Sequence, residues 1–456
     1  MAIIGVSLMK IAIIGGVAAG TSAAAKARRA DSNTEIVLFE KDKDISYAGC
    51  GLPYYISGVT STRDKVVINT PEEFIKKYEV DVRVRHEVTE IIPGKKLLKY
   101  KDLDQEKTGE YRYDKLIITT GASPLIPSIP GIELDNILQL RTVGDADRIK
   151  NIIEDQNPDK VTIVGAGLIG LEMAESFKES GLEVTVIEKL PHVLPQFSAD
   201  MAEIVEEHLK EKGVKLILGD GVKEFTGNKT VKKIYSEKGQ KIETDLVLIS
   251  IGIRPNVELA KKAGIKIGKT GAIAVNKKME TSQPDIYAAG DCAESIDLIT
   301  EKPVWVPLGS TANKQGRVAG ENATGGNYEH DGILKTGITK IFDLTVARTG
   351  LSEKEAKEEG FDVITTKIKV ANHAGYYPDL EMLHLKGVFD KKTGRIIGAE
   401  VIGKTGADKR IDVLSTAIYS KLTARDLFQI DLAYAPPYST PKDPIAVLGM
   451  VAEKKL

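Results

Sequence analysis

The chain of 456 residues holds two cysteines, Cys50 and Cys292, and neither belongs to a CxxC pair. This count excludes a disulfide framework and a cysteine-bound metal cluster, and it indicates a reducing compartment. Cys50 lies in the stretch SYAGCGLPYYISG, where Pro53 is well placed in the first turn of a helix that begins just after the thiol. The N-terminus of that helix would stabilise a thiolate and lower its pKa. Cys50 is therefore the candidate reactive thiol.

Two segments repeat the pattern that binds a dinucleotide. The first, KIAIIGGVAAGTSAAAKARR followed by EIVLFEK, reads as a strand, a glycine turn, a helix and a second strand that ends at Glu40. The second begins at residue 161 as VTIVGAGLIGLE, and its second strand ends at Glu188. Such turns bring backbone N–H groups to a pyrophosphate, and the acid accepts hydrogen bonds from a ribose. Two dinucleotides on one chain imply electron transfer between them.

The first turn departs from the GxGxxG pattern, because Val17 stands where the second glycine is expected. We expect its backbone to lie slightly farther from the phosphates. Further along, TSQPDIYAAGDCAE places Asp291 behind a strand and a tight glycine, where a carboxylate could bind a ribityl hydroxyl. The candidate cofactor-binding residues are Gly15, Gly16, Ala18, Ala19, Gly20, Glu40, Lys41, Thr120, Gly121, Gly165, Gly167, Leu168, Ile169, Gly170, Glu188, Gly252, Gly290, Asp291 and Ala312.

Composition excludes other classes of protein. Lys and Arg number 63 against 65 Asp and Glu, for a net charge of −2, and no basic stretch indicates nucleic-acid binding. The apolar runs have the length of strands, so we expect no membrane span. Because the first strand begins at Lys10, we interpret residues 1–8 as an upstream extension of a chain that starts at Met9. We expect the C-terminal PIAVLGMVAEKKL to be a helix docked on its own domain rather than a membrane-surface segment.

The pattern predicts an α/β protein in which two Rossmann-like dinucleotide-binding domains are followed by a third domain of α+β type. The stretches YDKLIITTGASPLIPSIPG and DLVLISIGIRPN each turn a strand into a glycine and proline turn, and we expect them to be paired crossovers between domains. No further phosphate turn occurs after about residue 328. We expect the first domain to comprise residues 9–118 and 254–327, the second 119–253 and the third 328–456.

The motifs GGVAAG, TTGASP, VGAGLIGLE, SIGIRPN and AAGDCA, in this order, resemble the FAD-dependent pyridine nucleotide disulfide oxidoreductases over essentially the whole chain. The resemblance implies a glutathione-reductase-like fold with an FAD domain, an NAD(P) domain and a C-terminal dimerisation domain, and it implies NADH or NADPH as electron donor. Dithiol members carry CxxxxC, whereas no second cysteine follows Cys50. The chain therefore resembles the single-cysteine branch: NADH peroxidase, NADH oxidase, coenzyme A disulfide reductase and the coenzyme A-dependent persulfide or sulfur reductases. In this context we interpret Cys292, next to Asp291, as a packing residue.

Two features favour the coenzyme A members of that branch. Peroxidases and many oxidases place a histidine in the first glycine turn, where this chain has Ala18 and Ala19. Coenzyme A disulfide reductases bring tyrosines from the partner subunit to the cysteine, and HAGYYPD and DLAYAPPYS match their patterns. The resemblance implies a homodimer with Tyr376 and Tyr434 supplied across the interface. The less favoured positions are their neighbours Tyr377 and Tyr438, and the alternative role for all of these tyrosines is packing at a dimer interface.

The resemblance also implies residues that contact coenzyme A, namely Arg29, Ser46, Lys77, Asn313 and Lys442. In the family pattern an asparagine often precedes the cysteine, where this chain has Gly49, which would leave a wider mouth for persulfides or other thiols. We predict a cytoplasmic enzyme that reduces coenzyme A disulfide, persulfide or polysulfide through a mixed disulfide at Cys50. The alternatives are an NADH oxidase or peroxidase cycling through a sulfenic acid, a reductase of a protein carrier, and a redox sensor. Glu188 favours NADH, while Lys189 and His192 keep NADPH open.

Overall fold

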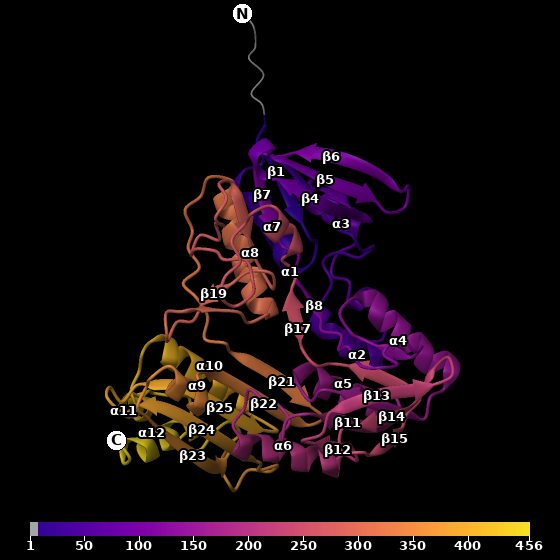
Figure 1. The fold of residues 1–456 in the computed structure, drawn as a ribbon. Coiled ribbons are helices and arrows are strands. Elements are labelled where there is room, and N and C mark those ends of the chain that lie inside the picture. The colour runs from indigo at the N-terminus through magenta and orange to yellow at the C-terminus, as the bar shows by residue number, and fades with distance from the viewer. Residues whose placement is uncertain (1–7) are drawn as a thin grey trace, which may run out of the picture.

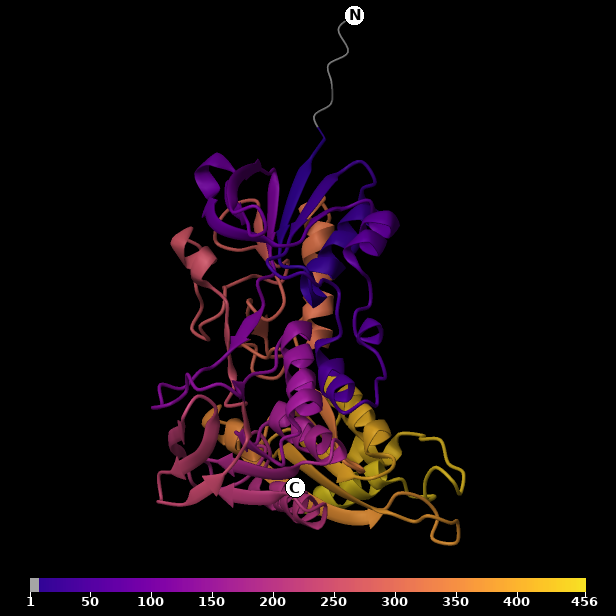
Figure 2. The same cartoon turned by 90° about the vertical axis from the view of Figure 1, so that its right-hand side faces the viewer.

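The computed structural model describes residues 8–456 (Figures 1 and 2). The interpretation of residues 1–8 as an upstream extension concerns a segment of which residues 1–7 lie outside the described part. Figure 1 shows three bodies: the first dinucleotide unit at the top, the second at the lower right and the C-terminal body at the lower left. Among residues 8–456, no helix combines the length and the apolar character that crossing a membrane requires.

The first unit is a parallel sheet with strand order β18-β7-β1-β2-β3. Its central strands are apolar and buried, as expected where helices cover both faces. A three-stranded antiparallel sheet, β4-β5-β6, is attached to it. The bounds are β1 Lys10–Ile14, α1 Ala18–Ala30, β2 Glu35–Phe39, α2 Leu52–Ile56, α3 Pro71–Tyr78, β3 Asp81–Arg83, β4 His86–Ile92, β5 Leu97–Asp102, β6 Lys107–Arg112, β7 Lys115–Ile118, α7 Glu258–Lys262, β18 Ile286–Ala288, β19 Ser295–Ile296, β20 Pro303–Val304 and α8 Gly309–Ala323.

The second unit repeats this plan with strand order β12-β11-β10-β16-β9, again parallel, and carries its own antiparallel sheet β13-β14-β15. The two units are connected by β8 Ala122–Pro124 and β17 Ile253–Pro255, which pair antiparallel and confirm the expected crossovers. The remaining bounds are β9 Ile137–Leu138, α4 Val143–Gln156, β10 Lys160–Val164, α5 Leu168–Glu179, β11 Glu183–Glu188, α6 Ala199–Glu211, β12 Lys215–Leu218, β13 Val222–Gly227, β14 Val231–Ser236, β15 Lys241–Glu243 and β16 Leu246–Ile249.

The C-terminal body is an antiparallel sheet of order β21-β22-β25-β24-β23 with helices on it, the α+β arrangement predicted. Ile445, Leu448 and Ala452 of α12 are buried in its core, so the prediction of a docked tail helix is confirmed. The bounds are β21 Gly337–Ile341, β22 Leu344–Gly350, α9 Glu353–Glu358, β23 Val363–Ala371, β24 Met382–Asp390, β25 Ile396–Gly403, α10 Ala407–Tyr419, α11 Ala424–Gln429 and α12 Pro444–Glu453.

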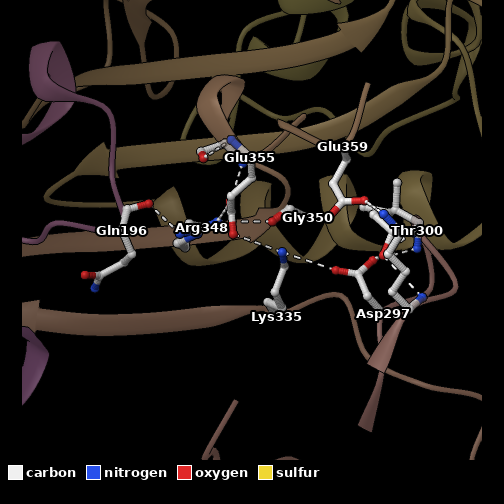
Figure 3. A network of polar contacts seen from close by, with 11 residues as sticks. Gln196, Asp297, Thr300, Lys335, Arg348, Gly350, Glu355 and Glu359 are labelled. Carbon is white, nitrogen blue, oxygen red and sulfur yellow. Dashed lines mark hydrogen bonds and ion pairs between the residues drawn. The ribbon is translucent and has the colours of Figure 1, made fainter. Parts of the chain in front are cut away.

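A charged network joins all three bodies where they meet (Figure 3). Lys335 pairs with the buried Asp297 at 3.2 Å and with Glu355 at 3.0 Å, and Arg348 pairs with Glu355 at 2.8 Å. Arg348 also donates to the carbonyl of Gln196 in the second unit. Burial acts to raise the pKa of Glu355, but its two cations and the Ser352 amide lower it to about 2. The network therefore stays charged at neutral pH and fixes how the bodies meet.

Candidate functional site

The Cys50 segment belongs to the first unit by sequence but packs on the second. Gly49–Gly51 form one 3-10 turn that leads into the short helix α2, with Pro53 in its first turn as predicted. Leu52 and Tyr55 are buried in the same apolar cluster as the second unit's core, and the Ser176 hydroxyl of α5 donates to the Pro53 carbonyl at 2.9 Å. Figure 1 shows α2 beside α4 and α5. The thiol is thus carried between the two dinucleotide units.

The Cys50 side chain is exposed, yet enough protein surrounds it to change its acidity. Desolvation by burial raises the pKa of the thiol, and the negative charges of Glu172 and Asp291 raise it further, while Arg141 acts in the opposite direction. The prediction of a lowered pKa is wrong for this arrangement of protein groups. The main physical reason is desolvation of the thiol by the surrounding protein, to which the two carboxylates add, and the five-residue helix α2 is too short to offset them.

Arg141 is a site residue that the sequence reasoning missed. Its Nε donates to the Ala122 carbonyl at 2.9 Å, and a guanidinium nitrogen lies 3.7 Å from the Asp291 carboxylate. A Cβ added at Gly121 would lie 3.1 Å from this guanidinium, and one added at Gly49 would lie 4.0 Å from it. Arg141 thus brings a positive charge between the cysteine loop, the crossover and Asp291.

One sequence signal could have pointed to Arg141. Thr142 and Asp145 form a capping box that starts α4, and Arg141 is the basic residue directly before it. A cation held at the start of a well-capped helix is a fixed charge, unlike one on a mobile surface loop.

The first glycine turn has the geometry of a phosphate cradle. Gly15 has φ +104°, which favours glycine, and a Cβ at Gly20 would lie 1.8 Å from the Gly15 carbonyl oxygen. No side chain caps α1 and no acid lies in its first turn, so its N-terminal amides are available to an anion. The buried Glu40 accepts from the Gly16 amide at 2.7 Å and the Asp42 amide at 3.0 Å. The residues present therefore fit a dinucleotide.

Other predicted cofactor residues of the first unit gather around this turn. A Cβ at Gly290 would lie 2.8 Å from the Ala19 Cβ and 3.4 Å from the Ala312 Cβ, so three distant parts of the sequence meet there. Thr120 donates to the Asn256 carbonyl at 2.7 Å, within the crossover that holds Gly121. Burial raises the pKa of Asp291, and Arg141 opposes this. Two further candidates, Ala18 and Lys41, are exposed at the start of α1 and directly after Glu40.

The second glycine turn repeats the first almost atom for atom. Gly165 has φ +106°, and a Cβ at Gly170 would lie 2.2 Å from the Gly165 carbonyl oxygen. Glu188 accepts from the Ala166 amide at 2.8 Å and the Leu190 amide at 2.8 Å. Helix α5 likewise lacks a side-chain cap and an acid in its first turn. Three further candidates of this unit lie at the turn, namely Gly167, Leu168 and Ile169. The fourth, Gly252, lies in the crossover.

The predicted tyrosines lie on two loops of the C-terminal body that project on the same side in Figure 2, one after β23 and one before α12. The hydroxyls of Tyr376 and Tyr434 are 3.4 Å apart although 58 residues separate them in sequence. Tyr376 is 77% exposed and Tyr434 47% exposed. The hydrogen bond between them raises the pKa of Tyr434. Among the described residues of one chain, no hydrogen bond joins either tyrosine to the Cys50 segment.

The coenzyme A candidates lie on several elements. Arg29 on α1 and Lys77 on α3 are exposed, and the neighbouring Arg28 ties these helices by donating to the Tyr78 carbonyl at 3.0 Å. Asn313 on α8 donates to the Ser22 hydroxyl of α1 at 2.8 Å. The other two are Ser46, whose hydroxyl accepts from the Asn69 amide nitrogen at 2.9 Å, and Lys442, which is exposed on the loop before α12. The structure groups α1, α3 and α8, while Lys442 belongs to the tyrosine loops.

The predicted packing residue Cys292 is fully buried, and its thiol lies 3.4 Å from the carbonyl oxygens of Ile118 and Ala289. Its burial raises its pKa, as expected of an inert thiol.

A family model described as pyridine nucleotide-disulphide oxidoreductase matches residues 9–316, and the model of the dimerisation domain of that family matches residues 337–443. The chain belongs to the pyridine nucleotide-disulphide oxidoreductases. This membership confirms the predicted fold class and the two predicted cofactors, FAD and NAD(P)H, and identifies the chain as an oxidoreductase with a dimerisation domain.

Relatives within this family are similar over nearly their whole length. The NADH oxidase of Methanocaldococcus jannaschii is 38% identical over 98% of this chain and 99% of that protein. The NAD(P)H coenzyme A polysulfide/persulfide reductase of Pyrococcus horikoshii is 40% identical over 97% and 98%. The coenzyme A disulfide reductase of Staphylococcus aureus is 36% identical over 97% and 100%. The resemblance to the single-cysteine branch is thus confirmed.

Among solved structures, the NAD-dependent persulfide reductase from A. fulgidus superposes with a TM-score of 0.96 at 40% identity. The match covers 98% of this chain and 83% of that one.

Proposed function

We propose that this chain uses NAD(P)H to reduce coenzyme A disulfide, or a coenzyme A persulfide or polysulfide, through Cys50. The observation that carries the proposal is the position of this thiol: it is exposed, it lies on a segment between two dinucleotide units, and no second cysteine follows it at the CxxxxC spacing. Because the other cysteine, Cys292, is fully buried, a disulfide at Cys50 needs its second sulfur from a substrate. Relatives named for coenzyme A disulfide and persulfide reduction support this substrate class.

The chemistry is a thiol exchange. The Cys50 thiolate attacks one sulfur of the substrate disulfide, a new S–S bond forms to Cys50, and the first coenzyme A leaves as a thiolate that takes up a proton. The first glycine turn and Glu40 would hold FAD, which would pass the two electrons of NAD(P)H needed to return the mixed disulfide to two thiols. With a persulfide, hydrosulfide is the leaving group.

Arg141 has a role in this exchange. Its guanidinium is the cation that opposes the raised pKa of Cys50, so it stabilises the attacking thiolate against Glu172 and Asp291. Its anchorage to the Ala122 carbonyl holds this charge in place.

Tyr434, with Tyr376, is the proton donor to the departing thiolate. A phenol whose pKa is raised by its neighbour keeps its proton at neutral pH, so it is available as a hydrogen-bond and proton donor to the departing thiolate and can recover a proton from solvent afterwards. In this proposal the pair is supplied by the partner subunit of a homodimer, and Arg29, Ser46, Lys77, Asn313 and Lys442 contact coenzyme A. The dimerisation domain and the exposure of both tyrosines support this arrangement.

The proposal also includes the domain boundaries and the location of the enzyme. We assign residues 9–118 and 254–327 to the FAD domain, 119–253 to the NAD(P) domain and 328–456 to dimerisation. Two free cysteines support a cytoplasmic location.

An NADH oxidase that cycles Cys50 through a sulfenic acid is the second candidate, because a relative of this name is 38% identical. The first glycine turn disfavours the oxidase, because Ala18 and Ala19 have no side-chain proton donor.

Replacing Cys50 tests the proposal. Cys50→Ser should abolish reduction of coenzyme A disulfide and persulfide while NADH still bleaches the flavin absorbance. The matched control is Cys292→Ala, which removes the buried thiol and should keep turnover. Undiminished disulfide reduction by Cys50→Ser would refute the assignment, and rapid NADH consumption with oxygen alone would favour the oxidase.

Replacing Tyr434 tests its role as the general acid. Tyr434→Phe should slow thiol release by about 10² to 10⁴. Turnover at the wild-type rate would contradict this role and favour packing at a dimer interface as the role of the tyrosines.

A further inference from the structure

A fully buried arginine bonds the two loops that carry the exposed tyrosine pair. Arg410 is 2% exposed and is located in the first turn of α10. Burying a guanidinium is costly unless its N–H groups are paired. Both terminal nitrogens of Arg410 have acceptors, while its Nε has none among the described residues. The partners of Arg410 are not on its own helix alone: they come from the two loops that carry the tyrosines.

The first of these loops, residues 372–381, is held at its base. Arg410 Nη2 donates to the Asn372 carbonyl at 3.1 Å. Asn372 is itself paired with Glu381, whose amide donates to the Asn372 side chain at 3.1 Å. The buried His373 side chain lies 3.2 Å from the Asp379 carbonyl across the same loop. The base is therefore fixed, and the tip with Tyr376 extends into solvent.

The second loop, residues 430–443, meets the same nitrogen. Nη2 lies 3.2 Å from the Tyr438 carbonyl, 3.2 Å from the Ser439 hydroxyl and 2.9 Å from the Asp443 carboxylate. Ser439 is fully buried and donates to Asp443 at 2.7 Å, and the other Asp443 oxygen caps α12 through the Ile445 amide at 2.9 Å. Although burial acts to raise it, the pKa of Asp443 is lowered by these donors, so the carboxylate is charged beside the cation.

The two loops also touch directly, since the Ala374 amide donates to the Pro436 carbonyl at 3.2 Å. One guanidinium therefore binds acceptors on both loops at the point where they meet. The 3.4 Å contact between the exposed phenols joins the same two loops. The other terminal nitrogen, Nη1, donates to the Gly406 carbonyl at 3.2 Å. A lysine has one nitrogen in place of this pair and cannot serve the Gly406 carbonyl and both loops at once.

We propose that Arg410 is a positioning residue for the reduction of coenzyme A disulfide: by binding both loops at their base it sets the Tyr376–Tyr434 pair. This inference rests on the proposed function, in which that pair donates the proton. Arg410 acts through the tyrosines and touches no substrate. Loss of its donors would separate the loops, leave Tyr434 without its neighbour and slow proton transfer, while the fold of α10 and the sheet remains.

The test is a double-mutant cycle between Arg410→Lys and Tyr434→Phe on the flavin-loaded dimer, with NADH-dependent reduction of coenzyme A disulfide as the assay. Arg410→Lys should lower turnover about tenfold in the wild-type background and leave it unchanged in the Tyr434→Phe background. An equal loss in both backgrounds overturns the proposal. If Tyr434→Phe alone has wild-type turnover, the proposed function of the tyrosine is what has failed.

A second readout does not depend on turnover. The Tyr434 phenol can be titrated by difference absorbance between proteins with and without Tyr434→Phe. Arg410→Lys should lower its midpoint towards that of a free phenol, about 10, because the Tyr376 contact is lost. An unchanged midpoint contradicts the positioning role even where activity falls.

Two further variants separate positioning from stability. Arg348→Lys is the matched control, since Arg348 is another largely buried, paired arginine of the same body that does not contact the tyrosine loops. It should lower Tm but keep the midpoint and the ratio of kcat to KM. If Arg410→Lys does not fold, Ser439→Ala removes one hydroxyl from the same cluster and should lower turnover about threefold, only when Tyr434 is present. No loss, or an equal loss in both backgrounds, overturns the proposal.

Discussion

The two dinucleotide units have the same turn but differ in what packs behind it. Gly15 and Gly165 have φ +104° and +106°, and in each unit an acid at the end of the second strand accepts from the amide that follows this glycine. Behind the first turn, α8 lies so close to α1 that a Cβ at Gly316 would be 2.3 Å from the Ala19 carbonyl oxygen. Small residues thus enclose the first site within the chain.

Behind the second turn, α5 packs Leu171 and Phe177 into the apolar cluster that also holds Ile341 of β21, and it adds polar contacts to the same strand. On α5, Glu172 accepts from the Thr339 hydroxyl at 2.5 Å and Glu175 pairs with Lys340 at 2.6 Å, both on the edge strand β21. Polar contacts at an edge constrain a helix less tightly than interlocked backbones. The same glycine turn therefore serves two roles. We expect the first turn to keep FAD bound and the second to let NAD(P)H bind and leave.

Glycine-to-alanine substitutions at the third glycine of each turn should have the largest effects and should affect the two cofactors differently. Gly20→Ala forces a Cβ to within 1.8 Å of the Gly15 oxygen, and Gly170→Ala forces one to within 2.2 Å of the Gly165 oxygen. Each should cost about 1–3 kcal/mol of folding stability. Gly20→Ala should be purified without flavin absorbance, whereas Gly170→Ala should keep the flavin and lose its reduction by NADH. Equal flavin loss in both would contradict separate sites.

The packing behind each turn offers the next largest effect. Gly316→Ala should lower the free energy of unfolding by about 1–3 kcal/mol and weaken flavin retention, because it separates α8 from α1. Thr339→Val removes one hydrogen bond to Glu172 and should cost about 1 kcal/mol without loss of flavin. Chemical denaturation and flavin absorbance after gel filtration measure both. Retained flavin in Gly316→Ala would show that the enclosure has no such role.

A smaller effect is expected from the acid of the first unit. Burial raises the pKa of Glu40, against the amides of Asp42 and Gly16. The folded state therefore holds this proton where the unfolded state has lost it, and stability falls as pH rises from about 4.5 through the raised pKa. Glu40→Gln should remove that fall. The measurement is Tm of flavin-stripped protein between pH 4.5 and 7, and parallel curves for variant and wild type would contradict the prediction.

The second glycine of the pattern should matter least to stability. A Cβ added at Gly167 meets no atom within 4 Å, so Gly167→Val should change the free energy of unfolding by about 0.5 kcal/mol or less. It should nevertheless raise the KM for NADH, since this glycine allows the backbone to approach the pyrophosphate. An unchanged KM would show that Val17 in the first turn is equally harmless.

Local parts of the site were predictable from the sequence because the chain itself builds them. The glycine turns, Glu40, Glu188 and the helix start after Cys50 depend on residues a few positions apart or on one βαβ unit. The capping box after Arg141 marks its position at the start of α4, but its contacts with Ala122 and Asp291 join distant segments. Arg410 had no local signal at all, because its partners lie on two loops far away in sequence. The same limit explains the wrong direction for the Cys50 pKa: the protein that desolvates the thiol, and the carboxylates of Glu172 and Asp291, come from other elements that no local pattern shows.

Mass spectrometry of the protein tests most directly whether Cys50 takes its second sulfur from coenzyme A. Protein treated with coenzyme A disulfide without NADH should carry one coenzyme A per chain, released by reductant and located on the peptide that contains Cys50. Unmodified Cys50, or a thiol that carries only added oxygen, would contradict the account.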